Sequence, residues 1–312
     1  MIAAQGLTKF YGAKCAVRNI SFEISNGEIV GILGLNGAGK TTTLRVLACL
    51  LLPSAGRVSI NGLDVAERSY DIRKQVGFLP EDPPLYPEMT VESFLAFSGE
   101  LRGLRRRDAQ QRMEEVLDIT HTKDVRREVI ANLSHGYRKR VGIGQAVIHR
   151  PPVLILDEPI SGLDPVQIVE MREMIRGLRG RHTILVSSHI LPEISQTCDR
   201  IIVIQEGEIV ATGTEEELTG KLTGAKRLNL LVRGPADQVV PFLKKQAYVT
   251  ACEVTGQLDG VLHLRLTTDQ DLREVLSREL IQAGFGLLQL NPAEAELESI
   301  FIQLTQKKEV VQ

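Results

Sequence analysis

The 312-residue sequence lacks the features that mark membrane-spanning and secreted chains. No apolar run approaches the about 18 to 20 residues that a helix needs to cross a bilayer, and the longest, around 29–35, is interrupted by glycines. The N-terminus has no basic segment followed by an apolar stretch, so a secretory signal is not expected. We therefore expect that any role at a membrane depends on a partner protein.

Cysteine pairs and an excess of one charge are also missing. The cysteines Cys15, Cys49, Cys198 and Cys252 are far apart and none forms a Cys-x-x-Cys pair. This spacing argues against a zinc site and a disulfide framework, and it fits a reducing cytosol. The 37 basic and 39 acidic residues leave a formal charge of -2, so we expect no nucleic-acid partner.

Short apolar runs alternate with helix-like stretches over residues 1–220. The runs are continuous, as expected of strands buried on both faces in a parallel sheet of an α/β domain. Between about 87 and 150 the pattern turns helical, with Thr90 as an N-cap, which predicts a helical insert. The expected strands are Ile29–Leu33, Val153–Leu156, Thr183–Ser187 and Arg200–Gln205, and Thr41–Leu52 is an expected helix.

Residues 221–312 are predicted to form a second, smaller α+β domain. Its pattern runs strand, helix, strand, strand, helix, strand, and one further helix follows. This order is typical of a ferredoxin-like unit. The expected strands are 227–233, 248–255, 261–266 and 285–290, and the expected helices are 237–246, 269–283 and 293–306.

The clearest motif is Gly34–Thr41, which fits G-x-x-x-x-G-K-[ST] between a predicted strand and a predicted helix. Glycines let backbone N–H groups turn inward around phosphate oxygens, and the following helix directs its positive end at them. We expect Lys40 to reach the β- and γ-phosphates and Thr41 to reach Mg²⁺. The predicted nucleotide-binding residues are Gly34, Asn36, Gly37, Ala38, Gly39, Lys40, Thr41 and Thr42.

A second motif places Asp157 and Glu158 directly after the apolar run Val153–Leu156. Asp157, at the carboxyl end of a strand, is suited to hold Mg²⁺. Glu158 is suited to orient and deprotonate a water molecule. Adjacent acids also occur at ordinary solvent-facing strand ends, so the motif is informative because it accompanies the phosphate loop.

Five further segments make residues 1–220 resemble the ATP-binding subunits of ABC transporters, whose fold is that of a P-loop NTPase. Ser134–Tyr137 resembles the signature motif and Ser161–Asp164 the D-loop. Gly77–Glu81 resembles the Q-loop and His189 the switch histidine. Tyr11 resembles the aromatic residue that stacks on adenine, although it could instead pack on its own domain.

The resemblance implies an ATPase that uses Mg²⁺ and drives transport, with export favoured. Its partners would be a transmembrane permease on a separate chain and a second ATP-binding subunit, as a homodimer, on the cytoplasmic face of the membrane. Ser134 and Asp164 would also act as helix N-caps. By the resemblance Glu158 and His189 are catalytic, Tyr11, Ser134, Gly136 and Asp164 bind ATP, and Thr41, Asp157 and Glu81 serve the metal.

Some residues depart from the family pattern. Glu81 stands where most of the family has Gln, so we expect it to act through the metal or to face the membrane partner. His135 and Tyr137 replace the usual Gly and Gln, whereas Gly136 is retained. These signatures resemble bacterial exporter subunits of the gliding-motility and multidrug type, and Glu298–Phe301 resembles their C-terminal signature.

Three other functions have less support. A soluble ABC ATPase acting on ribosomes or as a regulator would usually carry two ATPase domains or a long coiled-coil insert, and this chain has a single phosphate loop and no long heptad run. Glu158 argues against a switch that binds ATP without turnover. A P-loop kinase would leave Ser134–Tyr137 and Ser161–Asp164 unexplained.

Overall fold

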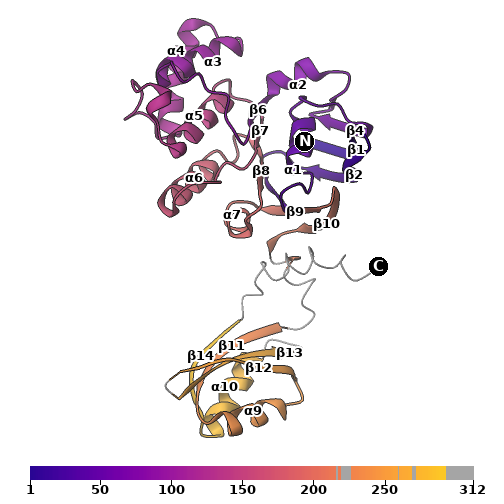
Figure 1. The fold of residues 1–312 in the computed structure, drawn as a ribbon, viewed down its shortest axis with the longest axis vertical. Helices are drawn as coiled ribbons and strands as arrows, with labels where there is room; N and C mark the ends of the chain where they lie inside the picture. The colour runs from indigo at the N-terminus through magenta and orange to yellow at the C-terminus, as the bar shows by residue number, and fades with distance from the viewer. Residues whose placement is uncertain (216, 219–225, 259, 269–271, 293–312) are drawn as a thin grey trace. The chain divides into compact units, whose positions relative to one another are not determined.

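The computed structural model describes residues 1–215, 217–218, 226–258, 260–268 and 272–292. The chain divides into two compact units, Met1–Thr214 and Glu215–Gln312 (Figure 1). The boundary expected between residues 220 and 221 lies outside the described residues. Among the helices that are described, none is both long and apolar enough to cross a membrane.

A six-stranded sheet forms the centre of the first unit, in the order β10-β9-β3-β8-β7-β6. Its strands from β9 to β6 are parallel, and β10 adds an antiparallel edge. All residues of β3 (Ile29–Leu33), β7 (Val153–Leu156) and β8 (Thr183–Ser188) are buried, which explains their continuous apolar sequences. The predicted α/β fold is therefore confirmed. The other strands are β6 (Val76–Leu79), β9 (Arg200–Gln205) and β10 (Glu208–Gly213).

A four-stranded antiparallel sheet, in the order β2-β1-β4-β5, forms a second layer. One hydrophobic core joins this sheet, helix α1 and the parallel sheet, and it includes Leu7, Leu47 and Ile32. The phosphate loop that precedes α1 is thus held between two packed layers. The strands are β1 (Ile2–Tyr11), β2 (Lys14–Ile24), β4 (Ala55–Ile60) and β5 (Leu63–Asp64).

Helix α1 is shorter than the sequence predicted. It spans Lys40–Leu47, whereas the expected helix ran from Thr41 to Leu52. Cys49 adopts the left-handed backbone conformation, with φ of 56°, and an α-helix cannot continue through it. The chain therefore leaves the helix before Pro53 rather than because of it.

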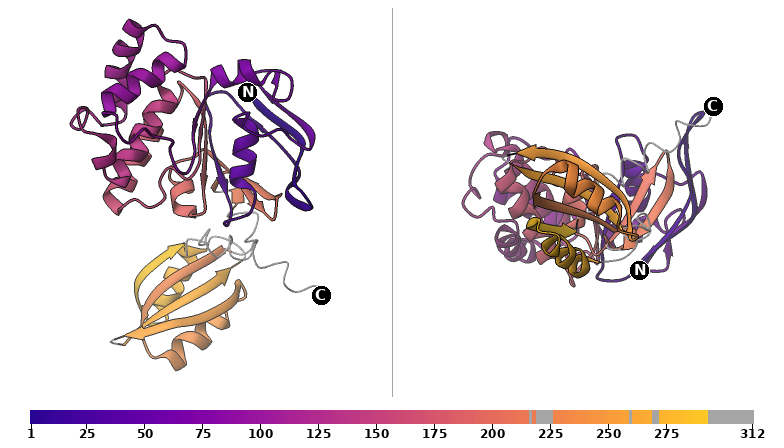
Figure 2. Two further views of the ribbon diagram at one scale, coloured as in Figure 1. Left: turned by 45° about the horizontal axis from the view of Figure 1, so that its top comes forward. Right: turned by 90° about the horizontal axis from the view of Figure 1, so that it is seen from below.

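Helices α3, α4 and α5 group on the side of the parallel sheet away from the antiparallel sheet (Figures 1 and 2). The Thr90 side chain caps α3 by accepting a hydrogen bond from the N–H of Ser93, as predicted. A Cβ on Gly77 of β6 would lie 2.1 Å from the carbonyl oxygen of Ala146, so the close approach of β6 and α5 requires glycine. The helices are α2 (Ser69–Gln75), α3 (Val91–Leu101), α4 (Arg106–Ile119), α5 (His135–Val147), α6 (Pro165–Gly177) and α7 (Leu191–Ser195).

The second unit contains a four-stranded antiparallel sheet in the order β12-β13-β11-β14. Alternate residues of β11, such as Leu228 and Leu230, share a core with Val239 of α9 and Leu276 of α10, so both helices cover the same face. The helix expected at 293–306 and the motif Glu298–Phe301 lie outside the described residues. The elements are β11 (Lys226–Arg233), α9 (Ala236–Lys244), β12 (Val249–Leu258), β13 (Val261–Thr268), α10 (Arg273–Gln282) and β14 (Gly286–Pro292).

Candidate functional site

Residues that follow β3, β7 and β8 line one cleft of about 790 Å³. Because these strands are parallel, their carboxyl ends meet at the same edge of the sheet, where open α/β sheets bind ligands. The end of β1, with Tyr11, and the start of β2, with Lys14 and Ala16, also line the cleft. The predicted residues that line the cleft are Tyr11, Asn36, Gly37, Gly39, Lys40, Thr41, Thr42, Glu81, Glu158 and His189.

At two glycine positions of the phosphate loop, a residue with a Cβ would clash with a backbone carbonyl oxygen. Gly39 has φ of 108°, and a Cβ there would lie 2.6 Å from the carbonyl oxygen of Ala16. A Cβ on Gly34 would lie 2.4 Å from the carbonyl oxygen of Ile204. Gly34 and Ala38, which were also predicted to bind the nucleotide, are buried and do not line the cleft.

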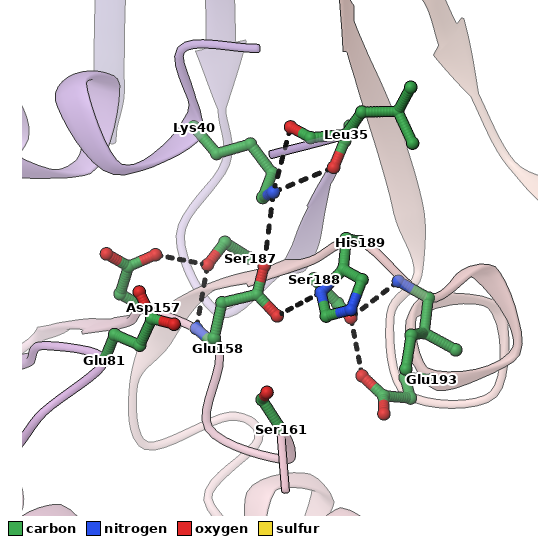
Figure 3. Close-up of polar contacts among 12 residues, drawn as sticks. Leu35, Lys40, Glu81, Asp157, Glu158, Ser161, Ser187, Ser188, His189 and Glu193 are labelled. Carbon is green, nitrogen blue, oxygen red and sulfur yellow. Dashed lines mark hydrogen bonds and ion pairs between the residues drawn. The ribbon is translucent and has the colours of Figure 1, made fainter. Parts of the chain in front are cut away.

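The Lys40 ammonium forms a buried ion pair with Glu158 at the floor of the cleft (Figure 3). Its Nζ donates a hydrogen bond to the carbonyl oxygen of Gly34 at 2.8 Å and lies 3.2 Å from Oε1 of Glu158. Both side chains are only 6% exposed. The pair places one positive and one negative charge side by side beneath the phosphate loop.

Glu158 lies between Lys40 and His189 (Figure 3). Its Oε2 is 3.0 Å from Nδ1 of His189. Its φ of 48° is in the left-handed region, which is uncommon for a residue other than glycine. The N–H of Glu158 donates to Oγ of Ser187 at 2.9 Å, and its carbonyl oxygen accepts from Nζ of Lys139 at 3.0 Å. Side chains thus form hydrogen bonds with both backbone polar groups, the N–H and the carbonyl oxygen, of this strained residue.

Asp157 lies beside the phosphate-loop threonine. Its Oδ1 accepts hydrogen bonds from Oγ of Ser187 at 2.6 Å and from Oγ1 of Thr41 at 3.3 Å. In the parts of the chain that the structure describes, no group of three or more His, Cys, Asp or Glu side chains is arranged to hold a metal ion. A hydroxyl and a single carboxylate nevertheless fit Mg²⁺, which keeps several waters and takes other ligands from phosphate oxygens.

Ser134, Gly136 and Asp164, which were also predicted to bind ATP, do not line this cleft. Ser134 is the N-cap of α5, where its Oγ accepts a hydrogen bond from the N–H of Tyr137 at 3.3 Å. Asp164 is the N-cap of α6. The capping roles expected for Ser134 and Asp164 are therefore confirmed, and the cleft of one chain does not include their side chains.

Asp164→Ala is expected to destabilise the protein by about 1 kcal/mol, because two backbone N–H groups would lose their acceptor. Oδ1 of Asp164 accepts from Val166 at 3.0 Å and from Gln167 at 2.9 Å. Thermal unfolding without nucleotide would measure the loss. Asp164→Asn keeps the capping oxygen and should unfold close to the wild-type temperature; equal losses in both variants would contradict the capping role.

Several polar residues that support the cleft were not among the predicted site residues. Ser187 bonds both Asp157 and Glu158. Ser188 donates to Glu193 and accepts from the N–H of Ile190, which shapes the turn at His189 (Figure 3). The serines end β8, which is parallel to β7, the strand that Asp157 follows, and that adjacency is a signal that could have identified them.

Buried ionisable side chains in this region have displaced pKa values. Burial raises the pKa of the Glu193 carboxyl, and the hydrogen bond from Ser188 opposes this effect. Burial lowers the pKa of the Lys139 ammonium, whereas the neighbouring carboxylates of Glu81 and Asp82 oppose the decrease. Both shifts reflect the cost of removing a charge from water.

A second groove, of about 510 Å³, lies on the same unit and is lined by residues from several elements. Leu50 and Leu51 follow α1, Phe78 belongs to β6, and Pro80 immediately precedes Glu81. Leu50 is 56% exposed, so the groove presents an apolar surface. The remaining lining residues are Arg45, Ala48, Arg73, Val76, Pro84, Arg102 and Gln145.

The sequence of the chain is similar to those of known proteins of one family. Residues 17–161 match the family model described as ABC transporter. The chain is 31% identical over 306 residues to the bacitracin transport ATP-binding protein BcrA of Bacillus licheniformis, covering 97% of each. It is 34% identical over 309 residues to the daunorubicin resistance ATP-binding protein DrrA3 of Streptomyces coeruleorubidus, covering 97% of this chain and 95% of that protein.

A solved structure agrees with this relationship. The ATP-binding subunit of an ABC transporter superposes with a TM-score of 0.65 at 31% identity, covering 71% of this chain and 93% of that one. The phosphate loop and the acidic strand end occupy one cleft in a chain that is similar to these relatives along nearly its whole length. The chain therefore belongs to the ABC transporter family, as an ATP-binding subunit with ATPase activity.

Proposed function

We propose that the chain powers an exporter of the gliding-motility and multidrug type, and that the exported substrate is a drug. The observation that carries the ATPase mechanism is the placement of Lys40, Glu158 and His189 in one cleft beside the phosphate loop. The export assignment is supported by relatives named for bacitracin transport and daunorubicin resistance.

ATP would bind with its phosphates along Gly34–Thr41. The backbone N–H groups of the loop and the N-terminus of α1 attract the phosphate oxygens, and Lys40 adds a full positive charge. Tyr11 lines the cleft and is 45% exposed, with the Lys9 ammonium 5.7 Å from the ring centroid, and its exposed ring would stack on adenine. When ATP binds, Lys40 would lose part of its interaction with Glu158 and interact with the phosphates instead.

Thr41 and Asp157 are the residues we assign to Mg²⁺. When bound, the ion would neutralise charge on the β- and γ-phosphate oxygens. Glu81 lines the same cleft and its carboxylate is exposed, so it would reach the ion through water. This assignment accounts for a carboxylate at a position where most of the family has an amide.

We assign the proton transfer to Glu158. Its carboxylate would accept a proton from the attacking water, which requires Oε1 or Oε2 to be released from Lys40 or His189. His189, hydrogen-bonded to Glu158 through Nδ1, would contact the γ-phosphate with its other ring nitrogen. The left-handed backbone of Glu158 directs this side chain into the cleft.

A second copy of the chain would complete the site. Ser134 and Gly136 lie at the N-terminus of α5, outside their own chain's cleft. A two-fold homodimer would bring this helix end to the γ-phosphate held by the partner. Asp164, at the start of α6, would join the same interface. His135 is directed in its own chain toward Ser161, whose carbonyl oxygen lies 3.3 Å from Nε2.

We propose that a separate membrane permease binds the groove at Leu50 and Phe78 and holds the chain against the inner face of the membrane. An apolar surface beside a functional cleft is a typical protein-binding site. The groove includes Pro80, so a partner seated there would displace the segment that carries Glu81 into the cleft. This gives a physical route by which permease and ATP site affect each other.

Leu50→Glu is expected to weaken binding to permease-containing membranes by about tenfold, because a charge would be buried at the contact. Co-sedimentation with membranes from the producing cell would measure it, with protein-free vesicles of the same lipids as a blank. Leu52→Glu is a matched control, because Leu52 is 57% exposed and does not line the groove. Equal binding by the two variants would contradict the groove as the docking site.

Residues 221–312 are proposed as a ferredoxin-like accessory domain that supports dimerisation or regulates the ATPase. The strand order β12-β13-β11-β14 and the position of both helices on one face support this proposal. Removal of residues 221–312 should then change the dimerisation or the ATPase rate of the chain, and unchanged behaviour would remove the regulatory role.

The proposed function is tested by phosphate release from ATP and by drug sensitivity. The purified chain should hydrolyse ATP with Mg²⁺ and lose this activity in excess chelator, because both metal and residues are required. A strain that lacks the gene should become more sensitive to bacitracin or daunorubicin. Absence of hydrolysis, alone and with native membranes, would contradict the ATPase role; unchanged sensitivity to both probes would contradict drug export alone.

A further inference from the structure

Lys139 is a buried cation that the mechanism above leaves unused. It lies in the middle of α5, is 1% exposed, and ranks among the largest fully buried side chains of the described residues. A lysine is seldom buried to this extent unless its ammonium is paired or hydrogen-bonded. The partners of its ammonium therefore indicate what the residue does.

Those partners are two backbone carbonyl oxygens at the edge of the ATP cleft. Nζ of Lys139 donates to the carbonyl oxygen of Glu81 at 2.5 Å and to that of Glu158 at 3.0 Å. The first oxygen belongs to the segment after β6 and the second to the turn after β7. One side chain thus joins helix α5 to the two segments that carry acidic residues into the cleft.

We propose that Lys139 is a positioning residue for ATP hydrolysis, which holds the peptide groups of Glu81 and Glu158 so that their carboxylates face the reacting phosphate. The inference rests on the proposed role of Glu158. Lys139 itself would touch neither ATP nor water, because its ammonium is turned to the carbonyl oxygens and closed off from solvent.

The backbone of Glu158 explains why such a contact is needed. Its φ of 48° is unfavourable for a residue with a Cβ, so the peptide will relax unless its surroundings prevent it. Ser187 holds the N–H, and Lys139 holds the carbonyl oxygen. Loss of Lys139 would leave the carbonyl oxygen of Glu158 with only the longer hydrogen bond from the N–H of Ser161, at 3.4 Å, and a backbone rotation there would move the carboxylate away from His189.

The position of Lys139 in α5 adds a connection between the proposed dimer contact and the catalytic edge. Ser134 caps the first turn of the same helix. A helix moves as a rigid body over so short a distance, so a shift of its N-terminus would displace Lys139 and the two carbonyl oxygens with it. The same side chain would therefore align Glu158 when the partner's phosphate engages α5.

A matched control is available in Arg112, a second buried cation that donates to backbone carbonyls. It is 8% exposed, and its Nε and Nη2 donate to Ile148 at 3.2 Å and Val147 at 3.1 Å, next to the far end of α5. Lys139→Met and Arg112→Met each remove a buried cation bonded to carbonyl oxygens, and Arg112→Met also removes an ion pair with Glu115, which keeps Arg150 as a partner. Only the first removes contacts with the cleft.

The experiment compares both variants with wild type in nucleotide-free amide hydrogen exchange, melting temperature, and kcat and KM for ATP. In Lys139→Met we expect exchange in the peptides that contain Glu158 and Glu81 to be faster by about tenfold, and kcat lower by at least about tenfold, with KM nearly unchanged. Arg112→Met should lose thermal stability while keeping its kcat and the exchange rates of those peptides. Lys139→Gln keeps N–H donors and should recover most of the wild-type exchange and kcat.

Two results would overturn the proposal. One is a folded Lys139→Met protein with wild-type exchange at both peptides. The other is a loss of kcat in Arg112→Met equal to that in Lys139→Met at equal loss of stability, which would make the effect purely structural. If wild type itself does not hydrolyse ATP, the proposed function fails, and the exchange measurement still decides whether Lys139 holds the two peptide groups.

Discussion

Glu158→Gln is expected to lower kcat for ATP hydrolysis by about 10²- to 10⁴-fold, because an amide cannot accept the proton of the attacking water. The substitution keeps the size of the side chain and the backbone contact with Ser187. ATP binding should therefore persist, and the variant should accumulate as an ATP-bound dimer, since hydrolysis is what reopens it. Phosphate release and size-exclusion chromatography in ATP and Mg²⁺ would measure both effects.

Glu28→Gln is the matched control for this substitution. Glu28 is also an ion-paired carboxylate, 2.8 Å from Nε of Arg200, but it does not line the ATP cleft. Its variant should hydrolyse ATP at close to the wild-type rate and remain monomeric after ATP is consumed. A Glu158→Gln protein that turns over ATP as fast as this control would exclude Glu158 as the general base.

The sequence was sufficient to predict the parts of the cleft that short motifs specify. A phosphate loop joins a buried strand to a helix within a few residues, so composition and spacing are sufficient to find Gly34–Thr41. Asp157 and Glu158 could be placed near it because the ends of parallel strands share one edge. The same reasoning brings His189, after β8, to that edge. The α/β fold follows from the same continuous apolar strands.

The supporting contacts could not be predicted in the same way. Lys139 is 58 residues from Glu81 and 19 from Glu158, and it binds their backbone carbonyls, which every residue type possesses. Such a contact therefore leaves no recognisable pattern in the sequence around Glu81 or Glu158. A lysine in a helix next to basic residues is typical of a solvated face, and only the packing of α5 against β6 shows that this one is buried.

The same limit applies to the end of α1. The sequence signal for a helix stop was Pro53, but Cys49 has already taken a left-handed conformation that nothing in its residue type requires. The shorter helix leaves Leu50 and Leu51 free to line the groove proposed for the permease. A local error in helix length thus concealed the surface through which the chain would contact its partner.

Lys40→Met is expected to weaken nucleotide binding by about 10- to 100-fold, because a charge-assisted hydrogen bond to phosphate is lost. It should also destabilise the empty protein. Glu158 would keep a carboxylate that is 6% exposed, with the imidazole of His189 as its remaining side-chain partner, and removing one partner of a buried pair costs about 3–5 kcal/mol. The melting temperature without nucleotide should fall by about 6 to 20 °C, since about 1 kcal/mol corresponds to about 2–4 °C in a protein of this size.

The double variant Lys40→Met with Glu158→Gln separates these two effects. Removing the carboxylate charge as well leaves no unpaired ion in the cleft, so the double variant should recover part of the melting temperature lost by Lys40→Met. It should recover none of the nucleotide affinity, because Glu158 does not replace the lysine at the phosphates. Two results would contradict this coupling: a Lys40→Met protein that melts at the wild-type temperature, or a double variant whose decrease in melting temperature equals the sum of the two single decreases. In either case Lys40 and Glu158 would not form an energetically coupled pair in the empty protein. ATP would then not have to compete with Glu158 for Lys40.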